Sequence, residues 1–252
     1  QPDTARTKLR FVRACRLSAA PLGFLESAMW KHIVVLANSV KHDPGRCIAG
    51  REISSEGADI GIGPWVRPTG IVGEGELYPR QFLLNDGTVP KTFDVIEIYV
   101  GAPAFEATQP ENWLILEDGC RWRRIHRWAI GDVMDRLVEK PPHLWLQPGV
   151  KSDRVTKEFL ALNPPEQSLY LLNVQGATVT KSGRKFRVRF SFNGTSYDLA
   201  VTDPLISHVV GEEQACAIPR CLLCVSLAPA FRNQYDGKEY HYKLAATVIP
   251  YE

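Results

Sequence analysis

Hydrophobic residues occur in short runs that are rich in β-branched and aromatic side chains, a pattern typical of β-strands. Segments rich in Gly, Pro and Asn-Asp-Gly turn signals separate several of these runs. The clearest runs are HIVVLA (32–37), DVIEIYV (94–100), NWLIL (112–116), SLYLLNV (168–174), CLLCVSL (221–227) and YHYKLAATVIP (240–250). Strands do not alternate with helices as they would around a parallel sheet, so the pattern predicts a mainly β protein.

The most regular alternation lies in residues 185–201. Four apolar residues alternate with four polar ones: Phe186, Val188, Phe190 and Phe192 against Lys185, Arg187, Arg189 and Ser191. Asn193-Gly194 then supplies a two-residue hairpin turn. Counting outward from the turn gives the pairs Phe190–Tyr197, Val188–Leu199, Phe186–Val201, Arg189–Asp198 and Arg187–Ala200. One face of this hairpin is therefore predicted to be core and the other basic.

One segment, CRWRRIHRWAIGDVMDRLVEK (120–140), has helical spacing instead. Its apolar residues recur on one predicted helix face, namely Trp122, Ile125, Ala129, Val133 and Leu137. Pro141-Pro142 ends the pattern. The arginines are offset by acids further along, so an amphipathic helix linking two β-domains is favoured over a nucleic-acid-binding helix.

These elements predict four regions along the chain. Residues 1–28 lack strand patterning and carry an excess of arginine; they are interpreted as an extension before Met29, with a transit peptide as the alternative. Residues 29–116 form a first β-domain, 117–150 a helical connector and 151–252 a second β-domain. About five strands in each half favour two OB-like five-stranded barrels joined by the amphipathic helix, and SH3-like barrels or sandwiches fit nearly as well.

Composition narrows the class of protein further. A net charge of +2 does not by itself indicate a polyanionic partner, so a basic site requires local clustering. No apolar run approaches the ~20 residues of a membrane-spanning helix. Six cysteines in a chain of this length favour reduced thiols and a cytoplasmic protein. Cys216, Cys221 and Cys224 have an iron–sulfur-like spacing, but their strand-like context favours buried thiols, and no metal or cofactor is expected.

The order of several motifs resembles the dual OB-containing family, uncharacterised prokaryotic proteins associated with phage defence and other conflict systems. The motifs are VVLANSVKHDPGRCIAGREI (34–53), GPWVRPTG (63–70), DVIEIYV (94–100), QPENWLI (109–115), LAVTDP (199–204), CVSLAPAF (224–231) and YHYKLAATVI (240–249). The match spans residues 31–250. The resemblance implies two OB-like barrels, and it implies no established activity.

A first candidate site lies in the 38–51 loop after the first strand. This loop gathers Asn38, Ser39, Lys41, Arg46 and Cys47, and the next segment adds Trp65 and Arg67. An aromatic ring beside cations suits a base and a phosphate, and loops at this position commonly line the OB binding groove. The favoured function is therefore a nucleic-acid or nucleotide-binding module, with Asn38, Ser39 and Cys47 as a possible pocket.

Two other functions stay open for the same loop. Arg46 and Lys41 could lower the pKa of Cys47 and make it a nucleophile, with His32 or His42 as the base of a nucleotide-processing enzyme. The chain could also be a purely protein–protein interaction module, for example with a partner encoded in a defence operon.

A second candidate site is the basic face of the hairpin. Five cations occur within nine residues without an acid among them: Lys181, Arg184, Lys185, Arg187 and Arg189. Such a face would contact the phosphates of single-stranded nucleic acid or of a nucleotide; the alternative is a solvated sheet surface.

Overall fold

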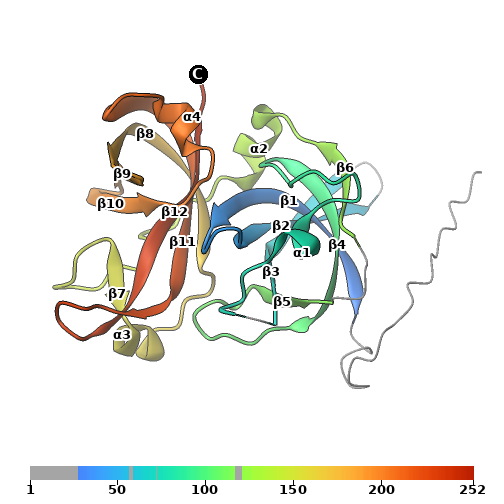
Figure 1. Cartoon of the computed structure of the whole chain (residues 1–252), viewed down its shortest axis with the longest axis horizontal. Helices are drawn as coiled ribbons and strands as arrows, with labels where there is room; N and C mark the ends of the chain where they lie inside the picture. Colours follow the sequence, from blue (N-terminus) through green and yellow to red (C-terminus); the bar gives the residue numbers. More distant parts are fainter. Residues whose placement is uncertain (1–27, 57–58, 72, 117–120) are drawn as a thin grey trace, which may run out of the picture.

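The computed structural model describes residues 28–56, 59–71, 73–116 and 121–252. The predicted extension at 1–28 therefore lies outside the described residues except for Ala28. Strands dominate these residues, and they form two six-stranded sheets (Figure 1). None of the helices in the described ranges has the length and hydropathy needed to traverse a bilayer.

The first sheet closes into a barrel. Its strands are β1 (Met29–Val40), β2 (Arg46–Glu56), β3 (Asp59–Thr69), β4 (Asp94–Pro103) and β5 (Asn112–Ile115). They pair in the order β1-β2-β3-β5-β4, β3 and β5 are parallel, and β4 returns to pair with β1. The short helix α1 (Pro79–Phe82) lies between β3 and β4. This order is that of an OB-fold.

The second sheet repeats the same topology. Its strands are β8 (Leu169–Ser182), β9 (Lys185–Phe192), β10 (Thr195–Val201), β11 (Ala215–Arg232) and β12 (Glu239–Pro250). They pair in the order β10-β9-β8-β11-β12, and a parallel β10–β12 pairing closes the barrel. Helix α4 (Ile206–Val210) lies between β10 and β11, while β7 (Arg154–Thr156) and α3 (Lys157–Leu162) precede the barrel. The prediction of two OB-like barrels is confirmed.

The hairpin register predicted from the sequence is also confirmed. Phe190 pairs with Tyr197, Arg189 with Asp198 and Val188 with Leu199. The turn residues Asn193 and Gly194 have φ of 46° and 76°, as a tight two-residue hairpin turn requires. The side chains of Val188, Phe190 and Leu199 pack in the core of the second barrel.

The helix predicted over residues 120–140 is shorter than its apolar spacing suggested. Residues Arg123–Arg127 form strand β6, which pairs with β4, and helix α2 covers only Ile130–Leu137. Arg123 forms an ion pair with Glu97 of β4, and Arg127 with Asp94. Pairing with the strand satisfies these groups, so tertiary contacts override the local helical spacing.

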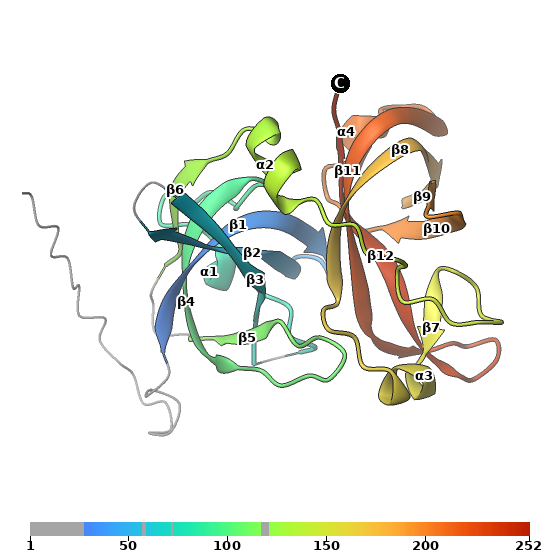
Figure 2. The same ribbon diagram turned by 180° about the vertical axis from the view of Figure 1, so that it is seen from behind.

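Three apolar clusters hold the molecule together. One fills each barrel, and the third lies between the barrels. The third cluster combines residues from both halves: Val34, Leu36, Ala37, Ala49, Trp65 and Val95 of the first barrel, Trp128, Val133 and Leu137 of the connector, and Leu169, Leu171, Leu222, Cys224 and Ala246 of the second. Helix α2 lies over this junction (Figure 2), and its buried Val133 and Leu137 explain the amphipathic pattern.

Candidate functional site

The shared topology of the two barrels indicates which surface of each corresponds to the ligand-binding face of an OB-fold. In this fold, ligands bind on the outer face of the second and third barrel strands, between the loop joining strands one and two and the loop joining strands four and five. The equivalent strands are β2 and β3 in the first barrel and β9 and β10 in the second. Both candidate sites from the sequence fall on these strands or on the loops beside them.

The loop between β1 and β2 holds its polar side chains in local contacts. Asn38 Nδ2 donates to the carbonyl of Pro90 at 2.7 Å, and Lys41 Nζ forms an ion pair with Glu74 at 3.0 Å. Ser39 Oγ donates to the carbonyl of Cys47 at 3.5 Å. Buried atoms without a hydrogen-bond partner in the described residues include Asn38 Oδ1 and Arg46 Nη1. The predicted pocket residues are therefore neighbours whose polar groups mostly stabilise the loop.

The environment of Cys47 is the opposite of what a nucleophile requires. Burial raises the pKa of its thiol, and the nearby Arg67 and Lys41 lower it too little to compensate. His32, one expected base, has its Nε2 within hydrogen-bond distance of Glu97 Oε1, at 3.1 Å. The expectation that neighbouring cations activate Cys47 is wrong, because the lost hydration of the thiolate outweighs their attraction.

Trp65 lies between the barrels and is not an exposed stacking surface. Its side chain is only 3% exposed, and its Nε1 donates to the Glu139 carboxylate at 3.1 Å. Arg51 and Gln167 donate to the same carboxylate at 3.1 and 2.8 Å, so residues of both barrels meet at Glu139. The second barrel and the connector cover Trp65, so the predicted contact with a base would require the barrels to separate.

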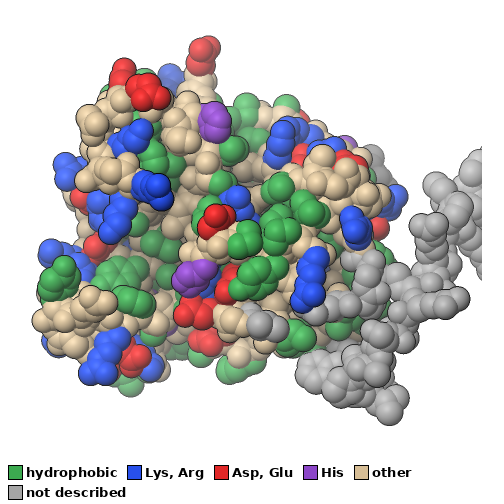
Figure 3. All heavy atoms as spheres, in the orientation of Figure 1, with side chains coloured by type: hydrophobic (Ala, Val, Ile, Leu, Met, Phe, Trp, Pro, Cys, Tyr) green, Lys and Arg blue, Asp and Glu red, His purple; other side chains and the backbone are tan. Residues whose placement is uncertain are grey.

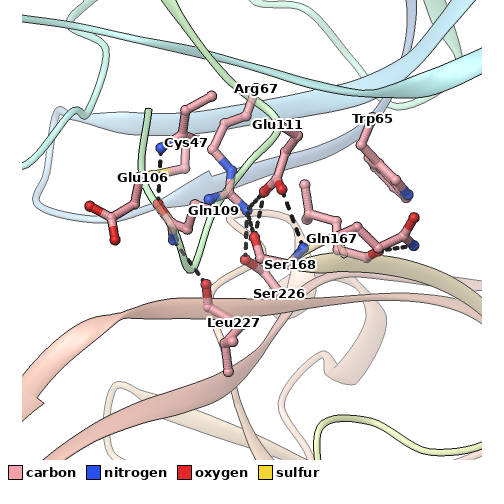
Figure 4. Close-up of polar contacts among 12 residues, drawn as sticks. Cys47, Trp65, Arg67, Glu106, Gln109, Glu111, Gln167, Ser168, Ser226 and Leu227 are labelled. Atoms are coloured by element: carbon pink, nitrogen blue, oxygen red, sulfur yellow. Dashed lines mark hydrogen bonds and ion pairs between the residues drawn. The ribbon is translucent and has the colours of Figure 1, made fainter. Parts of the chain in front are cut away.

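Arg67 has a similar position next to Trp65 on β3 (Figure 4). Arg67 is 6% exposed, and its guanidinium forms an ion pair with Glu111 at 2.9 Å. It also donates to Ser168 Oγ of the second barrel at 2.9 Å, and Ser168 in turn donates to Glu111. A carboxylate already compensates this buried charge, so the predicted phosphate contact of Arg67 would require a ligand to displace Glu111.

The loop joining β4 and β5 completes the cover over this face. Gln109 Nε2 donates to the carbonyl of Leu227 on β11 at 2.9 Å (Figure 4). The β2–β3 face and its flanking loop thus form the junction with the second barrel. A ligand could reach Trp65 or Arg67 only if the barrels separated.

The β9–β10 face, by contrast, is open to solvent. Lysine and arginine side chains gather over β9 and β10 in the space-filling view (Figure 3). Arg187 Nε and Arg189 Nε donate to the two oxygens of Asp198 at 2.6 and 3.1 Å. Counting along the strands predicts Ala200 as the only cross-strand neighbour of Arg187. The long side chain of Arg187 instead reaches diagonally to Asp198, so one carboxylate serves two arginines.

The turn before β9 carries cations without acidic partners. Arg184 and Lys185 are exposed, and the described residues offer neither of them an ion pair. Lys181 Nζ lies 5.9 Å from the centroid of the Phe186 ring. We call Lys185, Arg187 and Arg189, together with Arg184 in the turn before them, the β9 basic face; Lys181, predicted with them, pairs with Phe186 and so lies on the other side of the sheet. The charge of the β9 basic face is only partly compensated, unlike that of Arg67.

The three cysteines of the iron–sulfur-like spacing lie on β11. Cys221 and Cys224 are buried, and burial raises the pKa of Cys221 to about 11 and that of Cys224 further. Cys216 is partly buried. No cluster of potential metal ligands occurs among the residues that the structure describes. The burial of Cys221 and Cys224 agrees with the interpretation of these two thiols as core residues.

The family model of the dual OB-containing domain matches residues 31–248. The chain belongs to the dual OB-containing domain family. Among solved structures, this dual-OB chain is similar to the p204 HINb domain, with 10% identity, coverage of 88% of this chain and 98% of that one, and a TM-score of 0.36. A murine DNA-binding protein bound with double-stranded DNA gives 11% identity, 89% and 100% coverage and a TM-score of 0.32. Among curated proteins, no match was found.

Two features of the dual-OB chain were not identified from its sequence. Glu139 joins Arg51 and Trp65 to the second barrel, and only a tertiary contact reveals this role. The second feature is the β11–β12 turn with the exposed Tyr235. Asp236-Gly237 is a turn signal that could have located it.

Proposed function

We propose that this chain binds nucleic acid and that the β9 basic face contacts the phosphate backbone. The observation that supports this proposal most is the incomplete charge compensation of an exposed OB ligand face. Arg187 and Arg189 share the carboxylate of Asp198, with Asp153 3.9 Å from Arg187 at the edge of the face, and Arg184 and Lys185 have no ion pair within the described residues. A cluster of this kind attracts a polyanion although the net charge of the chain is small.

The neighbouring strand adds hydrogen-bonding groups to this face. Thr178, Thr180 and Ser182 of β8 are the cross-strand partners of Arg189, Arg187 and Lys185. Cross-strand partners lie on the same face of a sheet, and hydroxyl groups beside cations are common phosphate ligands. The arrangement suits contacts along a backbone and offers no obvious base-specific reader.

The test is oligonucleotide binding by the double variant Arg184→Ala/Lys185→Ala. Both side chains are exposed and lack an acidic partner among the described residues, so their loss should leave the fold intact. We expect affinity for an oligonucleotide to fall about tenfold and the log–log salt slope to flatten by ~0.7 per lost single-strand contact. Fluorescence anisotropy between about 50 and 200 mM salt measures both quantities.

A charge-matched control separates local contacts from the overall charge. Lys91→Ala/Arg136→Ala removes two exposed cations from the first barrel and the connector. This control should change affinity by less than twofold. Equal effects of the two double variants, or no effect of either, would contradict the proposal. Binding of a free nucleotide with no dependence on oligonucleotide length would favour the nucleotide alternative, whereas a link to phage defence remains a prediction from the family.

A further inference from the structure

We infer that the turn between β11 and β12 stacks a base of single-stranded nucleic acid on Tyr235. This inference rests on the proposed function and names the form of nucleic acid that the chain prefers. We call residues 233–238 the Tyr235 turn. It projects from the second barrel as the end of the long β11–β12 hairpin (Figure 1).

The Tyr235 turn is fixed by its own hydrogen bonds. Asn233 N donates to the Lys238 carbonyl at 2.8 Å, and Asn233 Oδ1 accepts from Tyr235 N at 2.8 Å. Asp236 accepts from Lys238 N at 3.1 Å and from the Tyr240 hydroxyl at 2.8 Å. A turn with this many internal bonds presents its side chains in a restricted set of directions, which lowers the entropy cost of binding.

The Tyr235 ring itself has no part in the core. Its side chain is 99% exposed, and Phe231 at the base of the same hairpin is 60% exposed. Large aromatic side chains normally stabilise a fold by burial. An exposed ring at the end of a hydrogen-bonded hairpin, with a second exposed ring at its base, suits an external flat partner better than a structural role.

The cations beside the ring suit a nucleic acid as that partner. Arg232 and Lys238, both exposed, flank the turn, and Arg232 Nε donates to the Gly237 carbonyl at 3.2 Å. The carboxylate of Asp236 is engaged within the turn. An aromatic ring between two cations matches a base attached to phosphates, and an unpaired strand exposes its base faces where a duplex does not.

The first barrel provides a matched control in the corresponding loop. Phe105 is 94% exposed in the β4–β5 loop, and its neighbour is the acidic Glu106. Phe105 has the same exposed aromatic character, but no lysine or arginine occurs within three residues of it, whereas Arg232 and Lys238 lie three residues from Tyr235. Its replacement should leave nucleic-acid binding unchanged.

The experiment compares Tyr235→Ala, Tyr235→Phe and Phe105→Ala in the full chain. Each is titrated with oligothymidylate of about 12 nucleotides and with an abasic strand of the same length, within the site size of an OB-fold. We expect Tyr235→Ala to weaken oligothymidylate binding at least about fivefold, with little effect on the abasic strand. Tyr235→Phe should keep most of the affinity, and Phe105→Ala all of it.

The outcomes separate this inference from the proposed function. Equal losses on both strands would overturn stacking, because the abasic strand offers no base. An unchanged Tyr235→Ala variant, with Arg184→Ala/Lys185→Ala still weakened, would overturn the inference alone. Tighter binding of a duplex than of either single strand would also overturn it. If the unaltered protein binds no oligonucleotide, the proposed function fails as well.

Discussion

The β2–β3 face of the first barrel and the β9–β10 face of the second occupy the same position in two barrels of the same topology. The first is covered by the neighbouring barrel, and its buried Arg67 has a carboxylate partner within 2.9 Å. The second is exposed, and Arg187 and Arg189 share one acid. Basic residues on an OB ligand face thus do not by themselves identify a binding site; the number and placement of the acids around them do.

The largest loss of stability is expected from removing the buried ion pair of the covered β2–β3 face. Glu111→Gln keeps the side-chain shape but leaves the buried Arg67 guanidinium without its carboxylate. Removing one partner of a buried ion pair costs about 3–5 kcal/mol, so urea unfolding should show a loss of this size. Oligonucleotide affinity of the folded variant should not change, because the β9 basic face belongs to the other barrel.

An exposed ion pair of equal length is the control for this variant. Lys157 and Glu239 lie 2.9 Å apart and are both largely solvated. Glu239→Gln should cost much less stability than Glu111→Gln, because solvent screens an exposed ion pair. A similarly small loss in Glu111→Gln would mean that the Arg67 pair does not hold the barrels together.

The second prediction concerns Trp65. Its replacement should lower affinity if the residue binds nucleic acid, and stability if it joins the barrels. Trp65→Phe removes the N–H that donates to Glu139. Hydrogen bonds to charged groups are worth about 1.5–3 kcal/mol, so the free energy of unfolding should fall by up to this amount. The affinity for oligonucleotides should stay the same. Loss of affinity without loss of stability would show that the barrels open and that the first face binds after all.

A third prediction contrasts the paired Arg67 with a buried cation of the second barrel. Lys243 is 1% exposed and its Nζ donates to the Ser152 carbonyl at 2.7 Å. Burial lowers its pKa to about 8, although Asp153 opposes the shift. Lys243→Met should raise stability near pH 7 by about 1–2 kcal/mol, because the cost of burying the charge disappears.

The pH dependence checks the cause of that change. Between pH 8 and 10.5 the unfolded chain keeps the Lys243 proton that the folded chain has lost. Stability of the unaltered protein should therefore rise with pH in this window, and below it the cost is fully present. Lys243→Met should remove this contribution to the rise. If both proteins show the same pH profile, burial of the charge does not limit stability.

The sequence allowed much of the second barrel to be predicted and less of the first site. Alternation and the Asn193-Gly194 turn determine the hairpin register locally, so Arg189 could be paired with Asp198 by counting. Trp65 and Arg67 could not be placed, because their partners Glu139 and Ser168 are distant in the sequence. Alternation shows that a side chain leaves the barrel interior, but not whether another domain covers it.

The misassigned helix has the same origin. Trp122 is buried in the first barrel, but Ile125 is exposed on β6. The spacing of the apolar residues matches a helix, whereas backbone pairing with β4 forms the strand, and ion pairs to Asp94 and Glu97 accompany it. Arginine-rich segments beside acidic strands carry this ambiguity until the tertiary partners are known.

The smallest effect is expected from replacing Asp198 on the exposed β9–β10 face. Burial alone would raise the pKa of Asp198, but hydrogen bonds from Arg187 and Arg189 lower it below the usual value, so it stays ionised at neutral pH. Asp198→Asn removes the carboxylate shared by the two arginines and should tighten oligonucleotide binding about two- to fivefold, the range of one exposed ion pair.

Asp86→Asn is the matched control, since Asp86 pairs with Arg124 of the first barrel at 3.0 Å. It changes the net charge equally but should leave affinity within twofold. An equal gain in both variants would attribute binding to overall charge, and a loss in Asp198→Asn would mean that the carboxylate positions the arginines rather than competing with phosphate.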